Sequence, residues 1–230
     1  MIPYIFLGIF VLTSVIHLYH SWSDDPKRRY TKPFMLACLT LYYCFAVKND
    51  PSISIIWCLI AALLTSWLGD VLLIPKGTKW FVAGGISFLF CHVFFIFVYF
   101  PQVDWSQTIW WIVIPAAILY YGISVRVTLS VKKNVPIMVL IPMILYLIMN
   151  STMNLFALMQ LMTLKNAGSI VAYVGAVLFF ISDCTLYLVR YHDNKDLIFK
   201  KHFTVMLTYL AGEALITIGI LMVQRGLAAV

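Results

Sequence analysis

Long apolar stretches recur along the whole chain, interrupted by short charged or Pro- and Gly-rich breaks. A helix of about 20 apolar residues is long enough to cross the hydrocarbon core of a bilayer. Because lipid offers the backbone no hydrogen bonds, such stretches predict transmembrane helices. We expect eight of them, near Ile2–His20, Lys32–Val47, Ile53–Ile74, Trp80–Phe100, Ser106–Arg126, Pro136–Met162, Ser169–Arg190 and His202–Val223.

The composition agrees with a membrane protein. Hydrophobic residues make up 63% of the 230 residues and charged residues only 11%, whereas a soluble domain has about 45–50% apolar and about 25% charged residues. These values exclude an ordinary water-soluble domain and a disordered chain. Eight spans and their loops use nearly the whole length, so we predict one all-α domain over residues 1–230, a polytopic helix bundle. Any chemistry must then lie inside the bundle or at its mouth.

The basic residues are distributed unevenly between the two ends of such a bundle. Of the 16 Lys and Arg residues, only Lys48, Lys165 and Arg225 fall at the end that holds both termini. Because cytoplasmic loops retain Lys and Arg, we predict that both termini lie outside. The net charge of +7 then reflects topology and contact with anionic membrane lipids, and we expect no nucleic-acid partner. A bacterial inner membrane and an endoplasmic reticulum membrane satisfy the same rule, and the oligomeric state is left open.

One predicted span differs from the others in length and polarity. The run Pro136–Met162 is long and contains Asn150, Ser151, Thr152 and Asn154 in its second half. Polar side chains can compete with the backbone for hydrogen bonds. We therefore expect a kink or a break in this helix.

Few ionisable residues lie within the spans, and they are Asp70, His92, Asp183 and Glu213. An ionisable group at membrane depth is costly unless it faces a cavity or a partner, so these residues are the first candidates for function. Both aspartates occur in a [Leu/Ile]-[Gly/Ser]-Asp-x-x-Leu pattern, on spans that run in the same direction. The two carboxyl groups could occupy one level of the bundle, and a parallel four-plus-four duplication would explain the shared pattern.

Three predicted helix faces combine ionisable and aromatic residues at three- or four-residue spacing. Together they predict an interior cavity that opens to the cytoplasm, with the two aspartates near its mouth. His92 and Glu213 should lie deeper, each about 18 Å from the cytoplasmic helix end. A polar mouth and an apolar depth suit an amphiphile such as a lipid. The residues that we expect to contact it are His92, Tyr187, Arg190, Tyr209 and Glu213.

The cytoplasmic end also offers cations for a phosphate group. Lys32 begins one span and Arg190 ends another, and we expect both to bind phosphate, with Arg126 as a further candidate. His17 and His20 lie near the end of the first span. They could face the site, but we expect them to extend toward the lipid headgroups.

At these positions the sequence resembles the YhhN family of membrane proteins, which includes the lysoplasmalogenases. The similar segments begin with Lys32-Pro33 and Leu68-Gly69-Asp70, followed by Gly85 to His92. They continue with Gly175 to Asp183 and with Tyr209 to Ile216, so the resemblance covers the last seven predicted spans. One departure is Glu213, where many relatives have glutamine.

The resemblance implies hydrolysis of the vinyl ether bond of a lysophospholipid substrate, a lysoplasmalogen. The products would be a fatty aldehyde and glycerophosphoethanolamine or glycerophosphocholine. Such a reaction needs a protonated acid beside the enol ether carbon and an ionised carboxylate that stabilises the cation and activates water. The sequence leaves open which aspartate is the acid. We favour Asp183, because its flanks are more apolar, with Asp70 as the base. No cofactor is needed.

Two alternatives stay open. A carrier could use Asp70, Asp183, Glu213 and His92 as a proton relay across the bundle. A zinc hydrolase is disfavoured because no His-x-x-x-His pair occurs, so we predict no metal, although His17, His92 and His202 could form a distant cluster.

Overall fold

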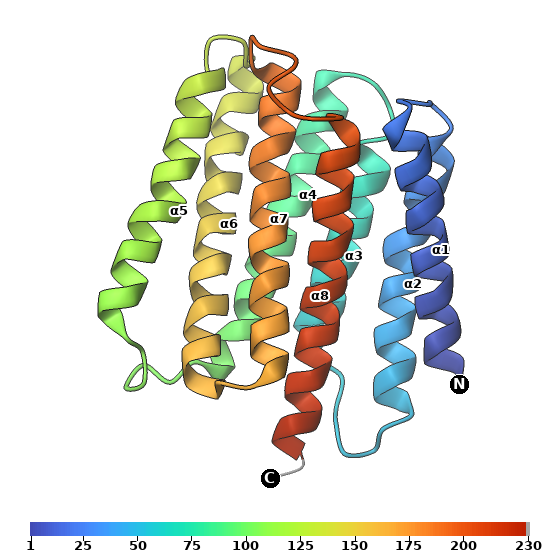
Figure 1. Cartoon of the computed structure of the whole chain (residues 1–230), viewed down its shortest axis with the longest axis vertical. Helices are drawn as coiled ribbons and strands as arrows, with labels where there is room; N and C mark the ends of the chain where they lie inside the picture. The colour runs from blue at the N-terminus through green and yellow to red at the C-terminus, as the bar shows by residue number, and fades with distance from the viewer. Residues whose placement is uncertain (229–230) are drawn as a thin grey trace.

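A computed structural model of the chain describes residues 1–228, which form eight α-helices and one short 3-10 helix (Figure 1). The number of helices matches the eight predicted spans. Their bounds are α1 Ile2–Trp22, α2 Arg28–Lys48, α3 Trp57–Leu72, α4 Thr78–Tyr99, η1 Phe100–Gln102, α5 Trp110–Val131, α6 Ile137–Leu164, α7 Ala167–Tyr191 and α8 His202–Ala228.

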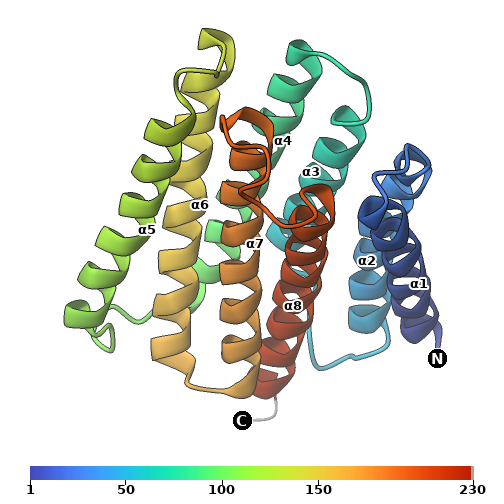
Figure 2. The ribbon, with the colours of Figure 1, turned by 45° about the horizontal axis from the view of Figure 1, so that its top comes forward.

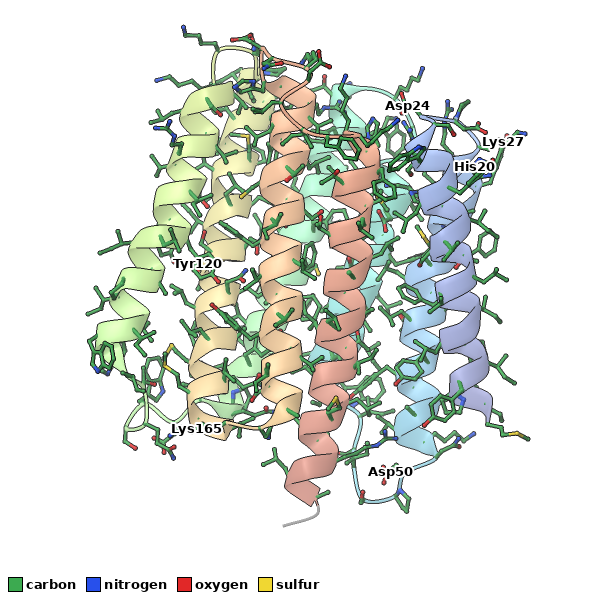
Figure 3. The ribbon with its side chains drawn as sticks, viewed as in Figure 1. His20, Asp24, Lys27, Asp50, Tyr120 and Lys165 are labelled. Carbon is green, nitrogen blue, oxygen red and sulfur yellow. The ribbon has the colours of Figure 1, made fainter. Side chains whose placement is uncertain are left out.

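The helices run up and down in one bundle. The N-terminus and the last turn of α8 lie at the lower end in Figure 1, and the four loops that follow α1, α3, α5 and α7 lie at the upper end. Figure 2 shows the same order from a second direction, with α1 and α2 together at one edge and α5 at the opposite edge. Figure 3 labels Lys27 and His20 at the upper end and Lys165 at the lower end. The loops that carry most of the Lys and Arg residues therefore lie together at one end of the bundle, which we call the basic end.

Six of the eight helices are long and apolar enough to cross a membrane, and these are α1, α4 with η1, α5, α6, α7 and α8. The two others fall short for different reasons. α3 has only 16 residues, and α2 carries Arg28, Arg29 and Lys32 near its beginning. The all-α fold is confirmed, with six helices that could cross a membrane by length and composition. Which side of a membrane the termini face stays a prediction.

The second and third predicted spans are shifted at their ends. α2 begins at Arg28 and not at Lys32, so Pro33 lies inside the helix. α3 ends at Leu72 and not at Ile74. Pro75 explains this end, because proline disfavours the helical conformation of the residue before it.

The expected break in α6 was wrong. The helix is continuous from Ile137 to Leu164. The hydroxyl group of Ser151 donates to the carbonyl of Leu147 at 2.8 Å, and the amide of Asn154 donates to the carbonyl of Asn150 at 3.0 Å. Polar side chains that bond one turn back can bend a helix without breaking it, so the kink stays a prediction.

Four glycines bring α7 and α8 into close backbone contact. They recur at seven-residue spacing, Gly168 and Gly175 on α7 and Gly212 and Gly219 on α8. A Cβ atom at Gly219 would lie 2.4 Å from the backbone nitrogen of Ala172. Small residues at such spacing allow membrane helices to approach closely. The contact fixes the helix that carries Asp183 against the helix that carries Tyr209 and Glu213.

Candidate active site

Asp70 is buried two residues before the end of α3, and both of its oxygens have partners. The ammonium group of Lys32 on α2 lies 3.0 Å from Oδ1. The phenol of Tyr209 on α8 donates to Oδ2 at 2.8 Å. The lysine and the phenol thus both donate charge-assisted hydrogen bonds to one carboxylate.

The contacts continue from Asp70 into the bundle through Ser66, one helical turn earlier on α3. The hydroxyl group of Ser66 lies 2.9 Å from that of Tyr209 and also bonds Oε1 of Glu213. The other oxygen of Glu213 has no partner among the described residues. We call Lys32, Asp70, Tyr209, Ser66 and Glu213 the Asp70 network; it joins α2, α3 and α8.

Asp183 lies on α7 and has different partners. Nε2 of His92 on α4 lies 3.1 Å from its Oδ2, and the amide of Asn150 on α6 donates to the same oxygen at 2.6 Å. The amide of Asn154 in turn donates to the side-chain oxygen of Asn150 at 3.0 Å. We call Asp183, His92, Asn150 and Asn154 the Asp183 network. Among residues 1–228, no lysine or arginine contacts it.

Aromatic rings fill the space between the two networks. The ring of Phe179 lies 4.9 Å from that of His92 and 5.5 Å from that of Tyr209. Phe88 packs edge-on against Tyr209 at 5.8 Å. Within the described part of the chain, no hydrogen bond or ion pair joins Asp70 to Asp183. The prediction that the two carboxyl groups share one level stays a prediction.

A cavity of about 290 Å³ opens at the basic end, between α1, α2, α4, α7 and α8. Lys32 lines it, so this residue links the cavity to Asp70. Neither aspartate lines the cavity itself. Its ionisable lining residues are His17, Arg28, Arg29, Lys32, Lys76, Arg190 and His202.

The route from this cavity toward Asp183 passes aromatic side chains. Phe81 lines the cavity and lies under the guanidinium group of Arg190, which is 4.0 Å from the ring centroid. Tyr187 packs edge-on against Phe81 at 6.2 Å and against Tyr146 at 5.8 Å. Tyr146 in turn packs against His92 at 4.9 Å. Aromatic rings of this kind form an apolar wall below the cationic mouth.

The structure brings the predicted site residues together in three groups. Lys32, Tyr209 and Glu213 join Asp70, His92 joins Asp183, and Tyr187 and Arg190 belong to the wall and mouth of the cavity. Arg126 lies elsewhere, in an exposed groove on α5. Its helix stands at the edge of the bundle (Figure 2), so Arg126 is not a candidate for the phosphate at this cavity.

Two predicted positions were wrong. His17 does not extend to the headgroups: it is fully buried, lines the cavity and bonds the hydroxyl group of Thr31 at 2.7 Å. The packing of α2 over α1 encloses it. His92 is not deeper than Asp183, because the two side chains are hydrogen-bonded. The depth estimate assumed that all helices begin at one height.

Sequence reasoning missed Ser66, Asn150 and the loop residues that line the cavity. Asn150 was noted only as a helix disturbance, because an asparagine inside a span is inexpensive compared with a charge. The only signal for Ser66 was its position one turn before Asp70, on the same helix face. Lys76 and Gly77 line the cavity from a loop, which a search restricted to the spans does not reach.

Among residues 1–228, no three His, Cys, Asp or Glu side chains are grouped as a metal site would require. His17 and His202 both line the cavity, whereas His92 belongs to the Asp183 network. The distant histidine cluster is therefore divided between two places.

Comparison with known proteins gives one match. A family model described as the YhhN family matches residues 27–220, which extend from α2 through most of α8 and include every residue of the two networks. No curated protein and no solved structure matches the chain. The resemblance inferred from the aspartate motifs is thus confirmed.

Proposed function

The chain belongs to the YhhN family, and from this premise we propose that it is an intramembrane lysolipid hydrolase that cleaves the vinyl ether bond of lysoplasmalogens. One observation carries the proposal. Two buried carboxyl groups have contrasting partners, a lysine beside Asp70 and a histidine and an asparagine beside Asp183. An acid and a base with separate environments are what this reaction needs.

The reaction begins at the Asp183 network. Asp183, paired with His92, gives a proton to the vinyl carbon that does not carry the oxygen, and the neighbouring carbon becomes an oxocarbenium ion. Asp70 stabilises the cation and takes a proton from the water that bonds to this carbon. Asp70 then passes that proton to the glycerol oxygen as the carbon–oxygen bond of the hemiacetal breaks. The proton of the hemiacetal hydroxyl group returns to Asp183, leaving aldehyde and alcohol.

Lys32 gives the substrate a means to activate Asp70. The lysine both lines the cavity and bonds Oδ1 of Asp70. A phosphate group in the cavity competes for the same ammonium group and frees this carboxylate oxygen for water. The cavity volume of about 290 Å³ is at the lower end for ligand pockets and suits a headgroup. The alkenyl chain continues past Phe81 and Tyr187 toward His92.

The test is release of aldehyde from lysoplasmenylethanolamine by purified protein in detergent. Asp70→Asn and Asp183→Asn should each reduce release by at least about 10²-fold, the lower range for loss of a general acid or base. Asp196→Asn is the matched control, because its side chain is 95% exposed and distant from both networks. Vinyl ether, alkyl ether and ester lysolipids are compared side by side. Aldehyde release that survives both aspartate substitutions would contradict the proposal.

A carrier is the second candidate, and one observation favours it. The Asp70 network is a continuous row of hydrogen-bonding groups from the cavity to Glu213. Such a row can carry a proton. A carrier would release no aldehyde from any lysolipid, but would give uptake into liposomes that depends on a proton gradient and on Asp70.

A further inference from the structure

The cavity at the basic end has a strongly unbalanced charge. Of its five Lys and Arg side chains, Arg28 is paired with Asp24 and Lys32 with Asp70. Arg29, Lys76 and Arg190 have no carboxylate partner among the described residues. No Asp or Glu belongs to the cavity lining. Three cations therefore face the cavity without a counter-charge.

The lining also lacks two usual partners of an ammonium group, a carboxylate and a free aromatic face. A primary amine needs a carboxylate or carbonyl oxygens, and a quaternary ammonium group is usually held by aromatic faces. Phe81 is the aromatic residue in the lining, and Arg190 already covers its ring at 4.0 Å. An ethanolamine or choline headgroup would place its cation beside the unpaired Arg29, Lys76 and Arg190. Like charges in a partly enclosed site are unfavourable.

His17 adds a buried polar group without a partner to the lining of the cavity. It is fully buried, and its Nε2 has no hydrogen-bond partner among the described residues. The hydroxyl group of Thr31 already donates to the carbonyl of Arg28, so it accepts from Nδ1 of His17. In the neutral ring, Nε2 is then an acceptor. It matches a hydroxyl group of a ligand, such as one on a glycerol.

We infer that the cavity selects lysolipids with an anionic, amine-free headgroup, a phosphate monoester or a phosphoglycerol, over those with ethanolamine or choline. The inference rests on the proposed function, because it names the substrate class for the same site. Arginine and lysine bind the phosphate oxygens by charge-assisted hydrogen bonds. The unpaired Nε2 of His17 accepts from a hydroxyl group of the ligand.

Binding is measured apart from hydrolysis. Alkyl ether lysolipids of one chain length, which lack the vinyl ether, compete for the full-length protein in a neutral detergent and are read by native mass spectrometry. The headgroups are phosphate, phosphoglycerol, phosphoethanolamine and phosphocholine. The two anionic headgroups should bind at least about tenfold more tightly than the two amine headgroups, and added salt should reduce this ratio.

Two double variants distinguish the effect of the cavity's charges on headgroup preference from the effect of general surface charge. Arg29→Gln with Lys76→Gln should reduce the ratio to about threefold or less, because both side chains line the cavity. Arg126→Gln with Lys133→Gln removes the same charge from α5 and the loop after it, and should leave the ratio unchanged. Equal binding of all four headgroups, or the same loss in both double variants, would overturn the inference.

Two further measurements identify the ligand and distinguish a failure of this inference from a failure of the proposed function. Glycerol 3-phosphate and inorganic phosphate test a soluble source, and either one competing as well as the lysolipids would refute lipid selection. Aldehyde release from the vinyl ether forms is measured in parallel. Aldehyde release without headgroup preference refutes only the inference, and headgroup preference without aldehyde refutes only the proposed reaction.

Discussion

Asp70 and Asp183 occur in the same short sequence pattern, and the fold gives them different surroundings. Asp70 is bound by Lys32 and Tyr209 close to a cationic cavity, whereas Asp183 is bound by His92 and Asn150 behind aromatic rings. The local pattern determines which face of the helix the acid occupies. Residues far away in the sequence determine its charge partner.

The two surroundings also correspond in position along the chain. Asp70 on α3 contacts the helix before it, α2, and the last helix, α8. Asp183 on α7 contacts the helix before it, α6, and the last helix of the first half, α4. Each acid thus takes one partner from the end of the other half of the chain. This cross-pairing supports the predicted four-plus-four duplication, which stays a prediction.

Lys32→Met, which removes the cation that distinguishes Asp70 from Asp183, should have the largest effect, a loss of stability. The change leaves the Asp70 carboxylate buried without its cation, which costs about 3–5 kcal/mol. Thermal unfolding in detergent measures the loss. Lys76→Met is the matched control, because Lys76 lines the same cavity without an ion pair among the described residues. A double change, Lys32→Met with Asp70→Leu, should recover most of the stability; equal stability of the two single variants would contradict a buried ion pair at Asp70.

A smaller loss is expected from Asn150→Leu in the Asp183 network. The change removes the amide that donates to Oδ2 of Asp183 at 2.6 Å, so this buried acceptor has one hydrogen-bond donor fewer. The expected loss of stability is about 1–3 kcal/mol. His92 still bonds the same oxygen, so this atom is not left without a partner. Thr152→Leu, two residues further along α6 and partly exposed, is the control, because it removes a hydrogen bond to the neutral Tyr121 at 2.8 Å in place of one to an aspartate. If Asn150→Leu destabilised the protein as much as Lys32→Met, the two acids would not differ as described.

Much of this architecture was predictable from the chain. Apolar runs predicted eight helices because helix length and lipid thickness are physically linked. The cost of ionisable groups in lipid singled out Asp70, His92, Asp183 and Glu213, and all four are buried in the two networks. The uneven Lys and Arg distribution predicted the basic end, where the cavity lies.

The sequence alone could not predict which side chains form pairs between helices, or how the helices are offset along their axes. Nothing local to Asp183 indicates that His92 is its partner, because that contact depends on how α4 and α7 are offset along their axes. Depths counted from helix ends failed for the same reason. His17 was placed at the headgroups because its enclosure depends on how α2 packs over α1. Such features arise from tertiary packing, which periodicity does not record.

The separation between the networks can be tested at Gly69, next to Asp70. A Cβ atom there would lie 2.6 Å from the ring of Phe88, which packs between the networks. Gly69→Ala must displace this ring, and overpacking costs typically about 1–3 kcal/mol. Gly85→Ala is the control, since nothing lies within 4 Å of its Cβ position, and alanine should stabilise that helix by up to about 1 kcal/mol. Equal effects at both glycines would show that Phe88 does not hold a fixed position.

The smallest expected effect is at Glu213, the inner end of the Asp70 network. Three contacts join four oxygens in a row, those of Asp70, Tyr209, Ser66 and Glu213. The hydroxyl group of Ser66 donates to Oε1 of Glu213, and that of Tyr209 donates to Asp70. The carbonyl oxygen of a glutamine side chain can accept the same hydrogen bond from Ser66.

Glu213→Gln should therefore change aldehyde release by less than about threefold, because the acceptor for the Ser66 hydroxyl group is retained. Glu213→Leu cannot bond Ser66 and should cost about 1 kcal/mol or more of stability. Thermal unfolding and the aldehyde assay are run on both variants. The proton-relay alternative gives a different result, because glutamine cannot release a proton: both variants would lose proton-dependent uptake into liposomes to the same extent. The comparison between the two substitutions thus separates a hydrogen-bonding role of Glu213 from a proton-transfer role.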